Sequence, residues 1–191
     1  GITVPMRQIA GELSPFMYEI DEMMKLDPVR MVSRIRRDTR YTHDKHMYRD
    51  NLWVMFMRPK HEWRYHPCMW FEVCQDSFSY GVGTYDVTPA LMELYRKALL
   101  ERPDEFLKAA KSAESIGAAF SAEEYKKPKP GTPSGELQKY YNVKNLFFVK
   151  HRRDFKTLES DEIIKQLKEE YKAYAPMYKF LLSISDEYIS S

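Results

Sequence analysis

Three stretches near the middle of the chain decide the fold class: Leu52-Trp-Val-Met-Phe-Met57, Cys68-Met-Trp-Phe-Glu-Val-Cys74 and Ser77-Phe-Ser-Tyr-Gly-Val-Gly-Thr-Tyr85. Each is apolar or aromatic over the length of a β-strand. Because they follow one another closely, they predict an antiparallel meander, with residues 59–67 joining the first two as a hairpin. The two glycines of the third stretch permit a bulge or a close approach of backbone.

Helices are predicted on both sides of these strands. Apolar residues at intervals of three and four predict a helix over residues 6–20, which Ser14-Pro15 is expected to divide in two. After the strands, Thr88-Pro89 has the residue types favoured at an N-cap and at the first helical position, and this helix should end by Pro103. A second helix is predicted over residues 104–115.

The C-terminal third adds a loop, a strand and a long helix. Residues 126–131 are rich in lysine and proline and are expected to form a surface loop. A strand is predicted over residues 146–149, and a final helix is predicted to begin at Ser160 and to be kinked or broken by Pro176. Strands clustered between helices predict a single α+β domain over residues 1–191, in which helices pack on an antiparallel sheet.

The composition narrows the class of protein. Hydrophobic residues make up 43% of the 191 residues, which indicates a packed core rather than disorder. The 30 lysines and arginines against 28 acidic residues leave a net charge of +2, which by itself favours neither a nucleic-acid nor a membrane partner. The chain has no apolar run of the roughly 18 to 20 residues that a transmembrane helix needs, and no signal-peptide pattern, so a cytoplasmic protein is expected.

The cysteines and histidines form no recognisable metal or cofactor pattern. Along an extended strand Cys68 and Cys74 would lie roughly 20 Å apart, which is beyond the reach of a disulfide. Both are expected to be free thiols that pack as apolar side chains. The five histidines lack zinc-ligand spacing, and the seven glycines include no phosphate-binding loop. The sequence therefore predicts neither a metal nor another cofactor.

Positive charge gathers in the residues before the first strand. Residues 30–49 contain seven lysines and arginines and two aspartates, a local balance of 7 − 2 = +5. Acidic residues collect elsewhere, at residues 123–124 and in the last helix, where they are expected to form a solvated face. The planar donor fork of arginine suits phosphate or carboxylate. This basic segment therefore predicts an anion site.

The same segment carries a family resemblance. Arg34-Ile-Arg-Arg-Asp-Thr-Arg-Tyr-Thr-His-Asp-Lys-His-Met-Tyr-Arg49 resembles the signature Arg-Ile-x-Arg-Asp-x-Arg-Phe-x-x-Asp-Lys-x-Pro-Tyr-Lys of the domain-of-unknown-function 2461 family. The resemblance continues with Gly83-Thr84-Tyr85 and Arg96, and it covers most of the chain from about Val4 onward. It implies an α+β fold and a shared polar cluster, and it implies no reaction.

Some positions depart from the family pattern. Tyr41, Met47 and Arg49 stand where the signature has Phe, Pro and Lys. The first and third keep the chemical character, whereas losing the proline is expected to loosen the loop before Tyr48. The family also has an upstream stretch with Asn-Asn and Trp-Phe residues that is absent here. The chain is therefore expected to miss an N-terminal part of the full-length protein.

The expected ligand-binding residues all lie in this segment. They are Arg34, Arg37, Asp38, Arg40, Asp44, Lys45 and Tyr48. One interpretation is that they bind an anionic small molecule, and another is that the two aspartates neutralise the arginines in a purely structural network. A third is an enzyme acting on a phosphorylated or carboxylated substrate with Asp38 or Asp44 as general base. A carboxylate held between arginines has a lowered pKa, however, and makes a weak base.

A second basic stretch accompanies the strand predicted over residues 146–149. It comprises Lys144, Lys150, Arg152, Arg153 and Lys156. Basic residues beside aromatic ones can bind single-stranded nucleic acid. We expect instead that Phe147 and Phe148 belong to the strand core and that the charges are solvated. A nucleic-acid partner would gain support only if this stretch shared a face with residues 34–49.

Overall fold

The computed structural model describes residues 3–34, 48–59, 61 and 64–191. Its elements, in chain order, are α1 (Thr3–Ile20), α2 (Pro28–Met31), β1 (Leu52–Phe56), β2 (Cys68–Val73), β3 (Phe78–Gly83), α3 (Pro89–Glu101), α4 (Pro103–Glu114), β4 (Ala119–Ser121), α5 (Gln138–Tyr141), β5 (Phe147–Arg152) and α6 (Glu162–Ser190), with 3-10 helices at Gly135–Leu137 and Phe155–Glu159. Thr88 caps α3 as predicted, since its hydroxyl accepts a hydrogen bond from Leu91 N.

The strands form one sheet in the order β1-β2-β3-β5-β4, and all neighbouring strands are antiparallel. The predicted meander is therefore confirmed, and so is the α+β class. β5 is longer than the strand predicted over residues 146–149. The three-residue strand β4 was not predicted, because a segment this short carries no measurable alternation.

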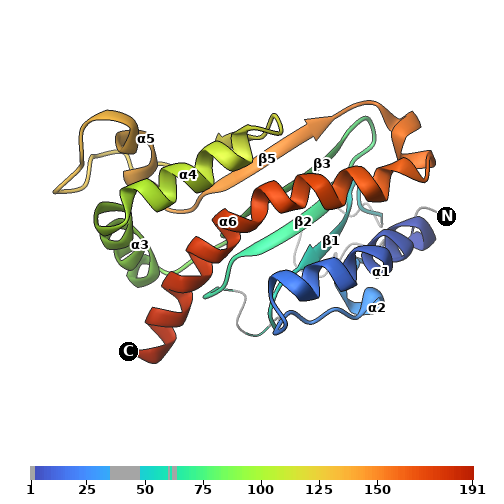
Figure 1. Ribbon diagram of the computed structural model, residues 1–191, viewed down its shortest axis with the longest axis horizontal. Helices are drawn as coiled ribbons and strands as arrows, with labels where there is room; N and C mark the ends of the chain where they lie inside the picture. Colours follow the sequence, from blue (N-terminus) through green and yellow to red (C-terminus); the bar gives the residue numbers. More distant parts are fainter. Residues whose placement is uncertain (1–2, 35–47, 60, 62–63) are drawn as a thin grey trace.

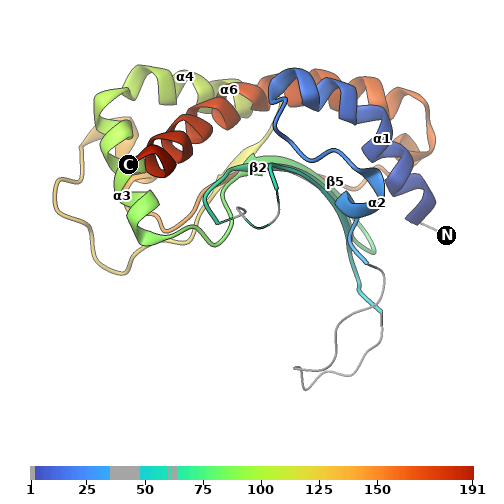
Figure 2. The same cartoon turned by 90° about the horizontal axis from the view of Figure 1, so that it is seen from below.

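Helices α1, α4 and α6 lie on one face of the sheet, and the sheet bends with its opposite face on the inside of the bend (Figures 1 and 2). Alternation along the strands explains which side chains meet the helices. Leu52, Val54 and Phe56 of β1 are buried, whereas Trp53 and Met55 between them are only half-buried. The buried core thus lies between the sheet and the helices.

A row of tyrosines joins α6 to the sheet. Tyr171, Tyr174 and Tyr178 recur on one face of the helix, and all three side chains are buried. The hydroxyl of Tyr171 donates to Trp70 O at 2.6 Å, and that of Tyr174 donates to Tyr80 O at 2.9 Å. Their burial raises the pKa of both hydroxyls, so they remain donors at any ordinary pH.

Neither internal proline ends its helix. The expectation that Ser14-Pro15 divides the first helix is wrong, because α1 runs unbroken through Pro15. Buried residues on both sides of the proline, such as Leu13 and Met17, pack in the core and hold the two halves in one line. Pro176 also lies inside α6, which bends near its middle in Figure 1 without breaking.

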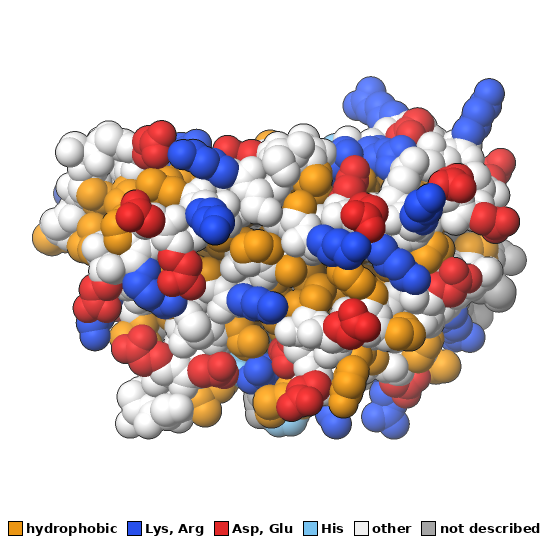
Figure 3. Space-filling view, in the orientation of Figure 1, with side chains coloured by type: hydrophobic (Ala, Val, Ile, Leu, Met, Phe, Trp, Pro, Cys, Tyr) orange, Lys and Arg blue, Asp and Glu red, His pale blue; other side chains and the backbone are white. Residues whose placement is uncertain are grey.

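The outer surface of the helical layer carries acidic and basic side chains that are interspersed (Figure 3). None of the helices in the described part of the chain is long and apolar enough to cross a membrane. Both cysteines are free, as predicted, and burial raises the pKa of Cys68 to about 12. Cys74 is half-buried rather than buried.

Candidate functional site

The face of the sheet opposite the helices is set by strand register. The residues that point to this side lie in three rows across the strands: Trp53, Glu72, Ser79 and His151; then Met55, Trp70, Gly81, Val149 and Ala119; then Cys68, Gly83, Phe147 and Ser121. We call this surface the open face, because in the described part of the chain no helix lies across it (Figure 2).

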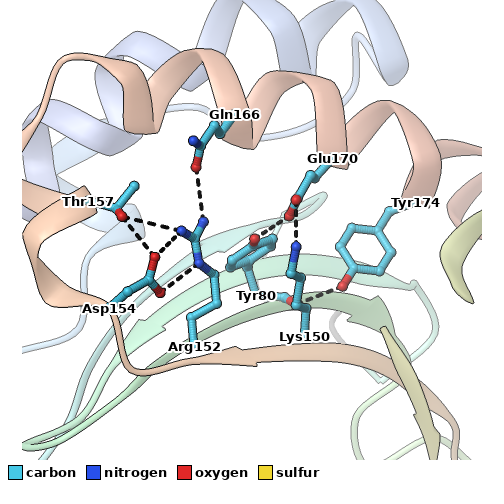
Figure 4. A network of polar contacts seen from close by, with 8 residues as sticks. All are labelled: Tyr80, Lys150, Arg152, Asp154, Thr157, Gln166, Glu170 and Tyr174. Atoms are coloured by element: carbon cyan, nitrogen blue, oxygen red, sulfur yellow. Dashed lines mark hydrogen bonds and ion pairs between the residues drawn. The ribbon is translucent and has the colours of Figure 1, made fainter. Parts of the chain in front are cut away.

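The other face of the sheet, which α6 covers, is called the covered face. There Arg152 forms several hydrogen bonds (Figure 4). Its guanidinium forms two hydrogen bonds with Asp154, a third with Gln166 at 3.0 Å, and a longer one with Thr157. The hydrogen bond with Asp154 is the main cause that raises the pKa of Arg152 and lowers that of Asp154. Its Cζ also lies 5.1 Å from the centroid of the Phe78 ring.

Lys150 lies beside Arg152 in the same layer, where its ammonium pairs with Glu170 at 2.6 Å and Tyr80 donates to the same carboxylate (Figure 4). The two cations of the second basic stretch that lie in β5, Lys150 and Arg152, thus both face the helices and pair with carboxylates, so the expectation that they are solvated is wrong. Phe148 is core as predicted, whereas Phe147 is half-buried on the open face. Glu170 is a half-buried ion-pair partner and not part of a solvated face.

The segment that carries the predicted site starts and ends close to β1, which is an edge strand of the sheet. Val32 pairs with Val54, while Ser33 N donates to Trp53 O at 2.8 Å and Trp53 N donates to the Ser33 hydroxyl. Arg34 follows directly and is exposed. Figure 2 shows the described chain on either side of residues 35–47 running on the side of the open face.

Arg49 lies over Trp53 at this end of the open face. The Cζ atom of Arg49 is 4.8 Å from the centroid of the Trp53 ring, a cation–π contact. Its Nε is buried and has no hydrogen-bond partner in the structure as described. Among the described residues no carboxylate forms an ion pair with Arg34 or Arg49. These two cations flank the segment that carries the largest local charge.

Glu72, Ser79 and His151 are direct cross-strand neighbours in the first row of the open face. Asn51 donates to the carboxylate of Glu72 at 2.5 Å. No hydrogen bond joins Glu72, Ser79 and His151 to one another in the described structure, so the row does not form a nucleophile-base pair of the kind that acyl transfer requires. It supplies a polar border to the open face.

The structure describes two of the seven predicted site residues. Arg34 and Tyr48 are exposed on either side of the segment, and 58% of the surface of Tyr48 is accessible. The other five, Arg37, Asp38, Arg40, Asp44 and Lys45, lie outside the described residues. The sequence predicts Arg49 as part of the basic segment but not of the site, and it predicts Trp53 and Trp70 only as strand residues.

A third charged cluster joins the helical layer to the end of β1. Asp21 is buried, and it accepts hydrogen bonds from Arg58 Nε at 2.8 Å, from the hydroxyl of Tyr178 at 2.7 Å and from Met23 N. Burial opposes ionisation of Asp21, but these hydrogen bonds outweigh it and lower its pKa. Arg58 also contacts Asp186 of α6. The donors and acceptors satisfy one another, so this cluster is structural.

On the helical side a cavity of about 500 Å³ lies between α4 and α5 and is lined by residues that include Lys111, Glu114 and Lys139. Another, of about 480 Å³, lies beside Asp21 and Arg58. Both are lined by charges of both signs. Within the described residues no group of three histidine, cysteine or acidic side chains could hold a metal ion.

Comparison with known proteins identifies a family and no activity. The model of the conserved hypothetical protein family DUF2461 matches residues 2–180. The crystal structure of an uncharacterized protein from Methanothermobacter thermautotrophicus is similar at 9% sequence identity, over 93% of this chain and 98% of that chain, with a TM-score of 0.40. No curated protein matches the chain.

Proposed function

The chain belongs to the DUF2461 family of conserved hypothetical proteins, and from the charges and contacts of this site we propose that it binds an anionic small molecule at the Arg49 end of the open face. The anionic group is a phosphate or a carboxylate, held by Arg34 and Arg49 together with the basic residues Arg37, Arg40 and Lys45 that the sequence predicts for this site. Of these groups, only the two flanking arginines rest on described positions.

The observation that carries the proposal is the state of Arg49. Its guanidinium is held on the Trp53 ring with a buried Nε that has no partner in the described structure. A buried donor without a partner costs free energy, which a bound anion would recover. Arginine presents a rigid fork that binds phosphate or carboxylate through two parallel hydrogen bonds.

The pairing of other cations in the described chain also supports the proposal. The half-buried or buried cations Arg58, Arg96, Lys150 and Arg152 each pair with a carboxylate. The segment from residue 30 to residue 49, by comparison, has an excess of +5. An excess confined to one segment of a nearly neutral protein attracts a small anion to that place.

Thermal unfolding in the presence of phosphate, sulfate, nucleotides, sugar phosphates and dicarboxylates tests the proposal. A ligand at a hundred times its dissociation constant stabilises the protein by about 2.7 kcal/mol. We expect one class of anion to stabilise the wild type, and Arg49→Ala and Arg37→Ala to lose most of this effect. Arg64→Ala is the control, since it removes one positive charge from an exposed ion pair with Asp86.

Two results would overturn the proposal. One is that no anion of the panel stabilises the wild-type protein. The other is that Arg49→Ala and Arg37→Ala bind the stabilising anion as tightly as Arg64→Ala does.

A further inference from the structure

We infer that the ligand carries a planar ring next to its anionic group, as an aryl phosphate or a nucleoside monophosphate does. This inference rests on the proposed function, because the anionic group is placed at Arg49. It specifies the other part of the ligand, a ring that contacts the side chains of the open face.

Aromatic side chains form the middle of the open face. Trp70 and Phe147 are half-buried, and their rings meet edge to face with centroids 5.5 Å apart and an interplanar angle of 88°. Trp70 stands directly opposite Met55 of β1 and Gly81 of β3, and Phe147 stands opposite Gly83. The two rings therefore lie over the centre of the sheet and not at its margin.

The two glycines of β3 make this arrangement possible. A Cβ at Gly81 would lie 2.7 Å from the Trp70 ring, and a Cβ at Gly83 would lie 2.6 Å from Cδ1 of Phe147. No side chain fits beneath the rings, so both rest directly on the backbone of β3. They form an aromatic floor on the sheet.

The aromatic floor is continuous with the anion end. Trp53 lies in the row next to Trp70 on the adjacent strand, and such diagonal neighbours lie roughly 7–8 Å apart, within reach of aromatic side chains. Arg49 covers Trp53. A ligand whose anionic group meets Arg49 would thus extend its other end over the Trp70 and Phe147 rings, where offset or edge-to-face contacts favour another aromatic ring.

The distribution of charge favours a small molecule over a polymer. Apart from the buried thiol of Cys68, the described titratable side chains in the strands of the open face are Glu72 and His151, while Lys150 and Arg152 point to the helices. A nucleic-acid strand needs cations that follow its backbone across the face. Here positive charge lies at one end, which matches a ligand with one anionic group and one ring.

The experiment compares ligands of similar charge with and without a ring. Binding of phenyl phosphate, adenosine monophosphate, glycerol 3-phosphate and inorganic phosphate is measured by calorimetry at constant ionic strength. We expect the two ring-bearing phosphates to bind at least tenfold more tightly than glycerol 3-phosphate. Trp70→Leu should remove this advantage while leaving the affinity for inorganic phosphate within twofold. Arg49→Ala should weaken all four ligands.

Phe147→Leu provides a second variant, because it removes the other ring of the aromatic floor and tests the same floor if Trp70→Leu fails to fold. Equal affinity for phosphates with and without a ring would overturn this inference and leave the proposed anion site standing. Absence of binding by all four phosphates, together with no stabilisation by any anion of the thermal-unfolding panel, would overturn both. An oligonucleotide that binds far more tightly than the mononucleotide, with a steep dependence on salt, would replace the small molecule by a nucleic acid.

Discussion

Two arginines of this protein lie over aromatic rings, one on each face of the same sheet. Arg152 lies over Phe78 on the covered face, and Arg49 lies over Trp53 on the open face, with similar distances of 5.1 and 4.8 Å. Arg152 has Asp154, Gln166 and Thr157 as partners, whereas Arg49 has a buried donor without one in the described structure. The same arginine–ring contact thus holds a paired guanidinium on the covered face and a guanidinium with an unpaired donor on the open face, among the described residues.

The difference follows from what covers each face. α6 brings tyrosine, glutamate and glutamine side chains down onto β3 and β5, so every cation there meets an acceptor. In the described part of the chain no helix lies across the open face (Figure 2), so α6 does not cover it with such side chains. A polar group on such a surface is completed by solvent or by a ligand.

The largest expected effect concerns the covered side of the molecule. Asp21→Ala leaves Arg58 without its main partner in a buried setting, where side-chain exposures are 4% for Asp21 and 11% for Arg58. Breaking one partner of a buried ion pair costs about 3–5 kcal/mol. We expect this loss in the free energy of unfolding measured with urea. Glu22→Ala, at an exposed neighbouring position, should stay within about 0.5 kcal/mol.

The pH dependence of stability gives a second readout of the same cluster. The pKa of Asp21 is lowered in the folded state, so its ionised form contributes stability above its ordinary pKa of 3.8. That contribution is lost as the pH falls from 3.8 through the lower folded value. Asp21→Asn should flatten this part of the acid limb. An acid limb unchanged in Asp21→Asn, or an Asp21→Ala variant as stable as Glu22→Ala, would show that the cluster does not hold the helical layer.

The next effect tests the aromatic floor. A Cβ at Gly81 would lie 2.3 Å from Phe148 O, a backbone atom that cannot rotate away, as well as against the Trp70 ring. Overpacking of this kind costs about 1–3 kcal/mol, so Gly81→Ala should destabilise the protein and change its tryptophan fluorescence. Gly11→Ala in α1 is the control.

At Gly11 a Cβ meets only Pro28 Cγ at 3.8 Å, and an alanine inside a helix is favoured over glycine by about 0.5–1 kcal/mol. The two substitutions should therefore change stability in opposite directions. If Gly81→Ala were as well tolerated as Gly11→Ala, the Trp70 ring would not rest on β3.

The sequence was sufficient for most of the fold because its strands and helix starts carry strong local signals. Thr88-Pro89 and the three central strands were predicted close to their observed bounds. The break at Pro15 was not observed, because a local penalty was outweighed by burial on both sides of it, which local rules do not measure.

The candidate site was only partly predictable, for a different reason. Charge gathers visibly in residues 30–49, and a resemblance marked the same segment. The open face could not be predicted from the sequence. Leu52 to Met57 is apolar at every position, and such a run does not indicate which side of the strand the helices cover. Only the placement of α6 and α1 decides that Val54 is buried while Trp53 is half-buried.

The smallest expected effect compares the two arginines directly. Arg152→Met keeps a long side chain on Phe78 but removes the hydrogen bonds with Asp154 and Gln166, and we expect it to cost about 1–2 kcal/mol of unfolding free energy. Arg49→Met loses the cation–π contact, worth about 0.5 kcal/mol, and removes a buried donor that has no partner in the described structure. Urea unfolding of both variants without added anion should therefore place Arg49→Met close to the wild type. Added phosphate should then stabilise Arg152→Met and not Arg49→Met. Equal losses of stability in the two variants, with equal responses to phosphate, would mean that the two faces use arginine in the same way.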